Sequence, residues 1–291
     1  MQIEVLVDLR HVLGEGPQWD VKTQRLYWID SFKKRIYRAT ADGRELKAWK
    51  APEIIGSICL TRQGSALVAG QTGLFEFDFD SEQAELIFAP KGLNQDQRLN
   101  DGKVDRNGHF FFGGMDMTEK AGLGKVYLCD KERRVQELDT GFVVFNGPCW
   151  SPDGKTFYAS DSSVGKIWRY DHDPITGALK NKVAIVSTDH PMNGSFDGCT
   201  VDEEGCLWSA RIFGGRIDRY SPDGALIQSI DMPIKKPTSV AFGGPDLNIL
   251  YVTSMGAQLS PDHPKDNYHR GALFAITDLG VRGIEEKRHD S

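Results

Sequence analysis

The chain has 291 residues, of which 40% are hydrophobic, and this length and composition allow one large core, so we expect a single domain over residues 1–291. The formal net charge of -6 argues against nucleic acid and anionic membranes as partners, because both bind clustered Lys and Arg. With no signal-peptide pattern and no stretch of ~18 apolar residues, we expect a soluble cytoplasmic protein, a monomer or weak homo-oligomer, that acts on a small molecule.

Six copies of one pattern follow each other along the chain, each made of two β-branched, aromatic or alternating runs joined by a variable link. They occupy residues 20–43, 62–80, 106–131, 152–173, 203–224 and 245–278. Their first runs are centred at intervals of 40 to 50 residues, on Tyr27, Leu67, Phe111, Phe157, Leu207 and Leu250. Four-stranded propeller blades repeat every ~40–50 residues. The pattern therefore predicts an all-β, six-bladed β-propeller.

The alternative all-β fold is a large β-sandwich, which has no reason to repeat the same double-run unit at a regular interval. In a propeller the repeat has a physical cause, because each small sheet has apolar faces that only its neighbours can cover. The N-terminal segment 3–8 also has a β-type sequence. We expect this segment to supply the strand that closes the ring.

Three loops place a polar side chain directly before a glycine, where the backbone can bend and approach a ligand closely. These side chains are Glu15, Asn146 and Asp197. Taken alone, each is more often a turn residue than a ligand. Together they offer two carboxylates and an amide oxygen, a donor set suited to a hard divalent cation. No histidine-pair zinc motif is present in the sequence.

A further loop, before the third unit, contains Arg98 and Asn100, two residues apart. In extended backbone their side chains point to one side and offer donors for sugar hydroxyls or for a developing oxyanion. An Arg beside an Asn-Asp-Gly turn is more often structural, and Asp101 and Asp105 serve equally well as turn caps. The five cysteines are scattered without a C-x-x-C pair, which argues against a disulfide framework or a cysteine zinc site.

The motifs around these residues share one order with a known family. LGEGPQWD, RLNDGKVD, FFGGMD and NGPCWSPDGKTFYASDS, followed by DGCTVDEEGCLW, resemble the family of gluconolactonase, regucalcin (senescence marker protein) and the bacterial sugar lactonases. The resemblance runs through nearly the whole chain. One departure is Phe196, where the family commonly has proline before the metal-binding aspartate, and it is expected to alter the pocket wall.

The resemblance implies a six-bladed propeller with an axial metal site. It assigns one divalent ion, Zn²⁺, Mn²⁺, Mg²⁺ or Ca²⁺, to Glu15, Asn146 and Asp197. It also implies that the substrate is bound by Arg98 and Asn100, with further contacts from a variable loop that contains Met115, Asp116 and Glu119. The implied activity is metal-dependent hydrolysis of a sugar lactone to the aldonic acid, with Asp197 as the catalytic residue.

Several alternatives stay open at the level of sequence. Asp197 either accepts the proton of the attacking water or only orients a metal-activated water. A non-catalytic Ca²⁺-binding regulator of the regucalcin type is the second functional interpretation, and a propeller scaffold for protein partners is a third, without a clear sequence sign. Lys235, Lys236 and Arg211 either favour an anionic substituent on the substrate or are solvated surface charges.

Overall fold

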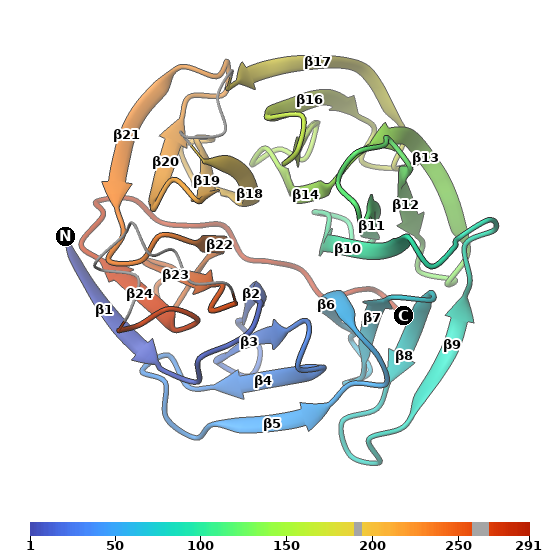
Figure 1. Ribbon diagram of the computed structural model, residues 1–291, viewed down its shortest axis with the longest axis horizontal. Helices are drawn as coiled ribbons and strands as arrows, with labels where there is room; N and C mark the ends of the chain where they lie inside the picture. Colours follow the sequence, from blue (N-terminus) through green and yellow to red (C-terminus); the bar gives the residue numbers. More distant parts are fainter. Residues whose placement is uncertain (189–193, 258–267) are drawn as a thin grey trace.

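The computed structural model describes residues 1–188, 194–257 and 268–291. These residues form six four-stranded antiparallel sheets arranged around one axis, as Figure 1 shows. The all-β, six-bladed propeller predicted from the repeats is therefore confirmed. Among the described residues there is no helix with the length and hydropathy needed to cross a bilayer.

The first three blades follow directly in chain order. Blade 1 contains β2 (Gly14–Asp20), β3 (Arg25–Asp30), β4 (Arg35–Ala39) and β5 (Lys47–Lys50). Blade 2 contains β6 (Ile55–Leu60), β7 (Ala66–Gly70), β8 (Leu74–Phe77) and β9 (Ala84–Phe88). Blade 3 contains β10 (Gln97–Val104), β11 (Phe110–Asp116), β12 (Gly124–Cys129) and β13 (Val135–Phe142).

The other three blades complete the ring. Blade 4 contains β14 (Phe145–Trp150), β15 (Thr156–Asp161), β16 (Lys166–His172) and β17 (Leu179–Ser187). Blade 5 contains β18 (Ser195–Val201), β19 (Leu207–Ile212), β20 (Arg216–Tyr220) and β21 (Leu226–Asp231). Blade 6 contains β22 (Pro237–Gly243), β23 (Ile249–Ser254), β24 (Leu273–Thr277) and β1 (Gln2–Val7).

Blade 6 is built from both ends of the chain. Strand β1 pairs antiparallel with β24, with Gln2 opposite Thr277 and Val5 opposite Phe274. The expected ring-closing role of the N-terminal segment is confirmed. Because the first and last strands share one sheet, the ring is held shut by main-chain hydrogen bonds.

The core lies between neighbouring blades. Strand β11 is buried along its whole length, whereas the outermost strand β9 is half exposed. Large aromatic side chains fill the gaps between blades: Phe111 packs edge-on against Trp150, with ring centroids 5.0 Å apart, and Trp208 packs against Phe242 at 5.7 Å. Burying each such ring contributes about 1.5–3 kcal/mol, so the contacts between blades account for the apolar runs in each repeat.

The innermost strands run in the same sense along the axis and create two different ends of the ring. In Figure 1 these strands, β2, β6, β10, β14, β18 and β22, lie nearest the centre. The chain after β24 crosses the end where they finish: Gly283 forms a bridge with Asp202, His289 forms one with Thr61, and Asp290 N donates to Gly108 O. This C-terminal segment, residues 278–291, joins blades far apart in the sequence.

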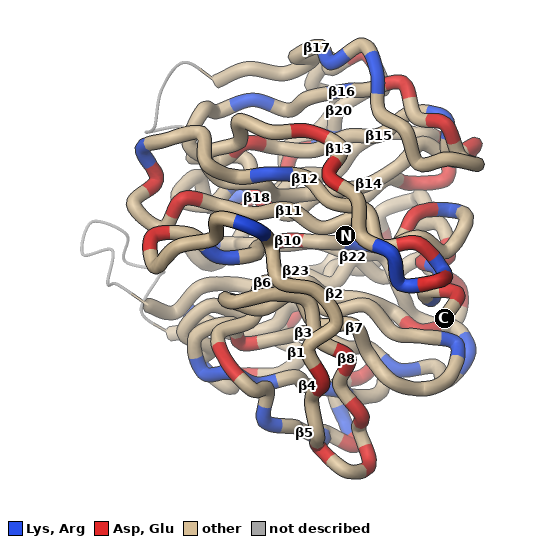
Figure 2. Tube along the Cα trace, turned by 90° about the vertical axis from the view of Figure 1, so that its right-hand side faces the viewer, with Lys and Arg blue, Asp and Glu red and all other residues tan. Residues whose placement is uncertain are grey.

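Charged residues of both signs alternate over the side of the molecule seen in Figure 2. Exposed ion pairs occur on the protein surface, such as Lys125 with Glu137 at 2.7 Å. On that side the net negative charge is therefore not gathered into one acidic face. All five cysteines are buried and free, as expected for reduced core residues.

Candidate metal and substrate site

The predicted site residues lie at the end of the axis where the innermost strands begin. Glu15 lies on β2, Arg98 and Asn100 on β10, Asn146 on β14 and Asp197 on β18. A cavity of about 420 Å³ opens there, which we call the axial cavity. Seven of the residues singled out in the sequence line it: Glu15, Arg98, Asn100, Met115, Glu119, Asn146 and Asp197.

A β-bulge occurs where each of these strands carries its candidate residue. Pairing with the next strand slips between Glu15 and Gln18 in β2, and between Asn146 and Cys149 in β14. Strands β10 and β18 slip between Leu99 and Gly102 and between Phe196 and Cys199. A bulge releases residues from the ladder and re-aims their side chains. Four separate blades thereby direct polar groups toward one cavity.

The glycines beside the candidates follow from the same geometry. Gly16 and Gly147 have φ values of 53° and 60°, in the left-handed region that glycine adopts without strain. At Gly147 the backbone also approaches β18 so closely that a Cβ would lie 2.8 Å from Asp197 O. Here glycine is required by both its conformation and the available space.

A hydrogen-bond chain joins the two predicted binding functions. Asn100 Nδ2 donates to Asn146 Oδ1 at 2.8 Å and to Phe145 O at 2.9 Å. Asn146 Nδ2 in turn donates to Ser162 Oγ at 2.8 Å. Both amide hydrogens of Asn100 are therefore used within the protein, and its Oδ1 is left as a side-chain acceptor. This differs from the expectation that Asn100 is a donor.

Burial gives the acidic groups of the cavity unusual properties. It raises the pKa of Asp197 well above its ordinary value, and the nearby Asp101 carboxylate adds to the effect. Burial likewise raises the pKa of Glu15, followed by repulsion from Asp197. The Arg98 guanidinium opposes both shifts, and burial lowers its own pKa to about 10. The ionised form of both carboxyl groups is therefore costly here unless a positive partner lies beside them.

These residues fit a hard divalent cation. Asp197 Oδ1 is buried and has no hydrogen-bond partner among the described residues, so it is an acceptor that still needs a positive partner. Glu15 and Asp197 provide carboxylate oxygens, and Asn146 Oδ1 keeps a second lone pair beside the one that Asn100 uses. An all-oxygen set of this kind suits Ca²⁺, Mg²⁺ or Mn²⁺.

Residues 13–256 match the family described as SMP-30/Gluconolactonase/LRE-like region. The chain belongs to this family. It is 35% identical over 279 residues to the 6-deoxy-6-sulfogluconolactonase of Pseudomonas putida, and the alignment covers 94% of each chain. It is 34% identical over 277 residues to the L-arabinolactonase of Azospirillum brasilense, and that alignment covers 94% of this chain and 91% of the relative. Among solved structures, the calcium-binding protein regucalcin from Agrobacterium tumefaciens is 28% identical, with a TM-score of 0.90 over 99% of this chain and 97% of that chain.

The three predicted contacts at the end of β11 and in the loop after it occupy different environments. Met115 and Glu119 line the axial cavity, and Glu119 Oε2 accepts a hydrogen bond from Ser163 Oγ at 3.4 Å. Asp116 does not line it. Its carboxylate accepts from Ala121 N at 2.7 Å and from two further main-chain amides of its own loop, which lower its pKa. Asp116 therefore caps the loop that follows it and is not part of the lining of the axial cavity.

Two other expectations about the pocket wall differ from the structure. Phe196 is 1% exposed and packs between blades, with the Arg211 guanidinium carbon 3.9 Å from its ring centroid. Lys236 is buried and donates to Ala257 O at 2.9 Å. Neither these two cations nor Lys235 line the axial cavity. Arg211 and Lys236 are accordingly interior residues, not solvated surface charges.

Sequence reasoning missed the apolar rim of the axial cavity. Phe32, Met117 and Phe213 are exposed at 39%, 36% and 42%, and all three line the cavity. Large apolar side chains are abundant in a propeller, so their sequence positions alone do not separate rim from core. Their unusual exposure is the signal, and it is visible only in the structure.

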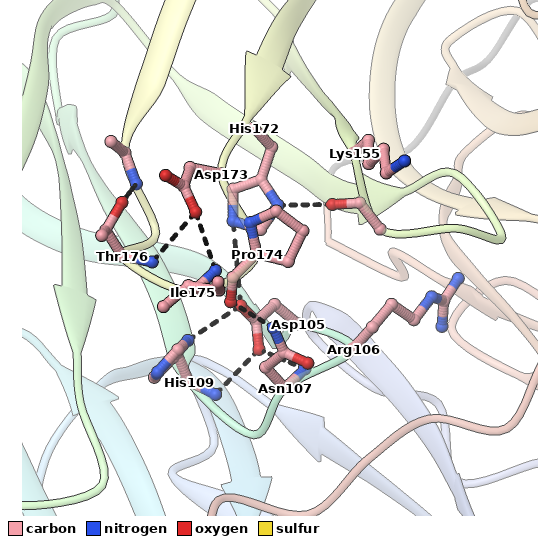
Figure 3. A network of polar contacts seen from close by, with 12 residues as sticks. Asp105, Arg106, Asn107, His109, Lys155, His172, Asp173, Pro174, Ile175 and Thr176 are labelled. Carbon is pink, nitrogen blue, oxygen red and sulfur yellow. Dashed lines mark hydrogen bonds and ion pairs between the residues drawn. The ribbon is translucent and has the colours of Figure 1, made fainter.

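Two polar clusters lie away from the cavity and are satisfied internally. Asp202, with Glu204 and Cys206, has the spacing of a metal site, but Arg219 pairs with both carboxylates at 2.6 Å. Asp105 caps the turn after β10, accepting from Asn107 N and His109 N, as Figure 3 shows. The turn-cap reading of Asp105 is confirmed.

Proposed function

We propose that the protein is a metal-dependent hydrolase that opens a sugar lactone to the corresponding aldonic acid. The observation that carries the proposal is the convergence of Glu15, Asn146 and Asp197 with Arg98 and Asn100 on one cavity. Relatives named as sugar lactonases, which align with nearly the whole chain, support the same reaction class.

Glu15, Asn146 and Asp197 would hold the cation. When bound, a divalent cation supplies Lewis-acid polarisation of a carbonyl group. The protein's own contribution is to fix the three oxygen ligands on separate, rigid blades. The neighbouring Asn100 amide holds Asn146 in place, so the ligand does not need to be ordered when the cation binds.

Arg98 and Asn100 would orient the lactone in two ways, Arg98 as a hydrogen-bond donor and Asn100 as an acceptor. Arg98 Nη1 donates to Leu99 O at 3.0 Å, whereas its buried Nε has no hydrogen-bond partner among the described residues. The guanidinium therefore keeps donors for the oxygen that becomes negative when the carbonyl carbon is attacked. Asn100 Oδ1 accepts a hydrogen bond from a sugar hydroxyl.

Asp197 is assigned the proton transfer. A water molecule attacks the carbonyl carbon, and its proton passes to the Asp197 carboxylate, whose Oδ1 has no hydrogen-bond partner in the part of the chain that the structure describes. The bond between the carbonyl carbon and the ring oxygen then breaks, and the same proton passes to the ring oxygen. The net change is the addition of one water across the ester, with Asp197 regenerated.

The test is hydrolysis of a panel of aldonolactones by the wild type and by Asp197→Asn. The protein is first treated with a chelator and then given Zn²⁺, Mn²⁺, Mg²⁺ or Ca²⁺ separately. We expect acid release to stop on chelation, to return with at least one ion, and to fall by at least ~100-fold in the variant, the lower end of the ~10²–10⁴-fold typical of a general base. Near wild-type turnover by Asp197→Asn with saturating metal would refute its assigned role.

A second candidate function is a non-catalytic Ca²⁺-binding regulator, favoured by the likeness to the solved calcium-binding regucalcin. The same oxygen ligands suit Ca²⁺. The lactone panel separates the two functions. A pure regulator binds Ca²⁺ but leaves every lactone opening at its spontaneous rate.

A further inference from the structure

A buried polar group lies on the axis beneath the candidate site. Asp101 and Lys103 come from β10, and Glu286 comes from the C-terminal segment, which crosses the ring in Figure 1. The three side chains line one small cavity together with Gln18 and Ser239. Asp101 is 7% exposed, and the side chains of Lys103 and Glu286 are 16% and 7% exposed. Charges this deeply buried require specific partners.

Asp101 completes the bulge of β14. Its Oδ2 accepts a hydrogen bond from Gly147 N at 2.8 Å, and its Oδ1 accepts from Gly102 N at 2.7 Å. Gly147 lies within the register shift of β14, so its amide lacks a partner in the neighbouring strand. The carboxylate takes the place of that partner directly after Asn146. Asp101 thereby connects the bulge of its own strand with that of the next blade.

Lys103 makes the corresponding connection to β18. Its Nζ donates to Cys199 O at 3.1 Å, at the first paired position after the bulge that contains Asp197. Cys199 Sγ in turn lies 3.3 Å from the main-chain oxygen of Asp197, which is within the bulge. Glu286 Oε1 lies 3.1 Å from the same ammonium group and fixes it from the side of the C-terminal segment.

The strands joined in this way belong to blades 3, 4 and 5, which are separate sheets. No β-ladder therefore sets the distance between β10, β14 and β18. This distance matters because the relative position of Asn146 and Asp197 decides whether both can bind one cation. Side chains that cross between the innermost strands perform this task.

We propose that Asp101 and Lys103 are positioning residues that hold the bulges of β14 and β18 in register with β10, and that Glu286 extends this control to the C-terminal segment. The inference rests on the proposed function only in assigning Asn146 and Asp197 to a cation. Outer contacts of this kind typically change metal affinity or activity ~10–100-fold when removed. The C-terminal segment is then part of the site's support although it lies at the opposite end of the axis.

The experiment measures Ca²⁺ and Mn²⁺ binding by titration calorimetry, kcat and KM on the lactone panel, and thermal unfolding. The variants are Asp101→Asn, Asp101→Ala, Lys103→Met and Glu286→Gln. We expect metal affinity to fall ~10–100-fold for Asp101→Ala and Lys103→Met, and by less for Asp101→Asn, which keeps an acceptor oxygen. The metal affinity of Glu286→Gln is expected to lie between the affinities of Lys103→Met and the wild type.

The matched control is Arg288→Met, which removes another ion pair of the same segment. Arg288 Nη2 binds Asp20 Oδ2 at 2.6 Å at the far end of β2 and contacts no bulge. It should lower the unfolding temperature and leave metal affinity unchanged. Because Lys103→Met leaves Glu286 buried without its partner, the double variant Lys103→Met with Glu286→Leu serves if the single variant does not fold.

The outcomes separate the two proposals. A wild type that binds metal but opens no lactone refutes the hydrolase, and the positioning role is then decided by metal affinity alone. Wild-type metal affinity in Asp101→Ala and in the folded Lys103 variant overturns the positioning role, even if the wild type is an active lactonase. An equal loss of affinity in Arg288→Met also overturns it, because the effect would then be one of stability.

Discussion

The Asn100 amide nitrogen lies 2.8 Å from Asn146 Oδ1, so the residue expected to bind substrate also holds a residue expected to bind the cation. We therefore predict that Asn100→Ala weakens both functions together. Metal affinity should fall by about tenfold, at the lower end of the ~10–100-fold range for outer contacts, and KM for the lactone should rise. Calorimetry and steady-state kinetics measure the two effects. A rise in KM with unchanged metal affinity would contradict the coupling.

Arg98 is the cationic side chain expected to meet the developing negative charge. Replacing it with methionine should lower kcat ~10²–10³-fold, as removal of one oxyanion donor does, while metal affinity should be retained or increased because a positive neighbour is lost. Arg98→Lys keeps the charge and serves as the control, with an intermediate kcat expected. If Arg98→Met changes only KM, the residue binds the ground state and not the transition state.

Gly16 and Gly147 allow the cost of a strained backbone conformation to be separated from the cost of a steric clash with a neighbouring strand. Both have positive φ, but an added Cβ meets nothing within 4 Å at Gly16, whereas at Gly147 it would lie 2.7 Å from Cys199 Sγ. Gly16→Ala should cost about 1 kcal/mol of stability. Gly147→Ala should cost more and also reduce metal affinity, because it pushes β14 away from β18. Denaturant unfolding and metal titration of both variants test this, and equal effects would count against the close approach.

The turn in Figure 3 predicts opposite pH effects from two histidines. A hydrogen bond from His109 Nδ1 to Asp105 Oδ2, 3.0 Å long, raises the pKa of His109 above its ordinary 6.5. Its contribution to stability is complete below pH 6.5 and is lost as the pH rises through the raised value. Burial lowers the pKa of His172, so its contribution is present above pH 6.5 and is lost as the pH falls through the lowered value.

Unfolding by denaturant between pH 5 and pH 8 checks both signs. His172→Asn keeps a donor near the Nδ1 position that bonds Gly154 O and should make the loss of stability on the acid side shallower. Burial also lowers the pKa values of His11 and His289, so part of the acid-side loss should remain. His109→Asn should flatten the curve above pH 6.5. An unchanged pH profile in both variants would refute these assignments.

Much of the architecture follows from the sequence because each blade must cover the apolar faces of its neighbours, which makes the pattern repeat. Glu15, Asn146 and Asp197 could be selected because each precedes a glycine, and the bulges explain that spacing. The capping role of Asp116 could also have been predicted from the sequence, because Thr118 follows it two residues later, as in an Asx turn.

Other features depend on contacts that sequence patterns do not encode. The Lys103–Glu286 pair joins residues far apart in the chain, and although Lys103 lies in the RLNDGKVD motif, nothing in that motif indicates Glu286 as its partner. The commitment of both Asn100 hydrogens depends on where Phe145 O and Asn146 Oδ1 lie in the next blade. In the sequence, Arg211 and Lys236 cannot be told from surface cations. Their burial results from the packing of the blades and is seen only in the structure.

The pairing of β1 with β24 also affects how the molecule reaches its folded state. On the ribosome, residues 2–7 are made before almost all of the ring, yet their partner strand is among the last to emerge. Until then β1 has no ladder to join, and blade 6 keeps an unpaired edge that can recruit strands from other chains. Pairing over so long a sequence separation is slow, so ring closure should be the step at which nascent copies are most exposed to aggregation.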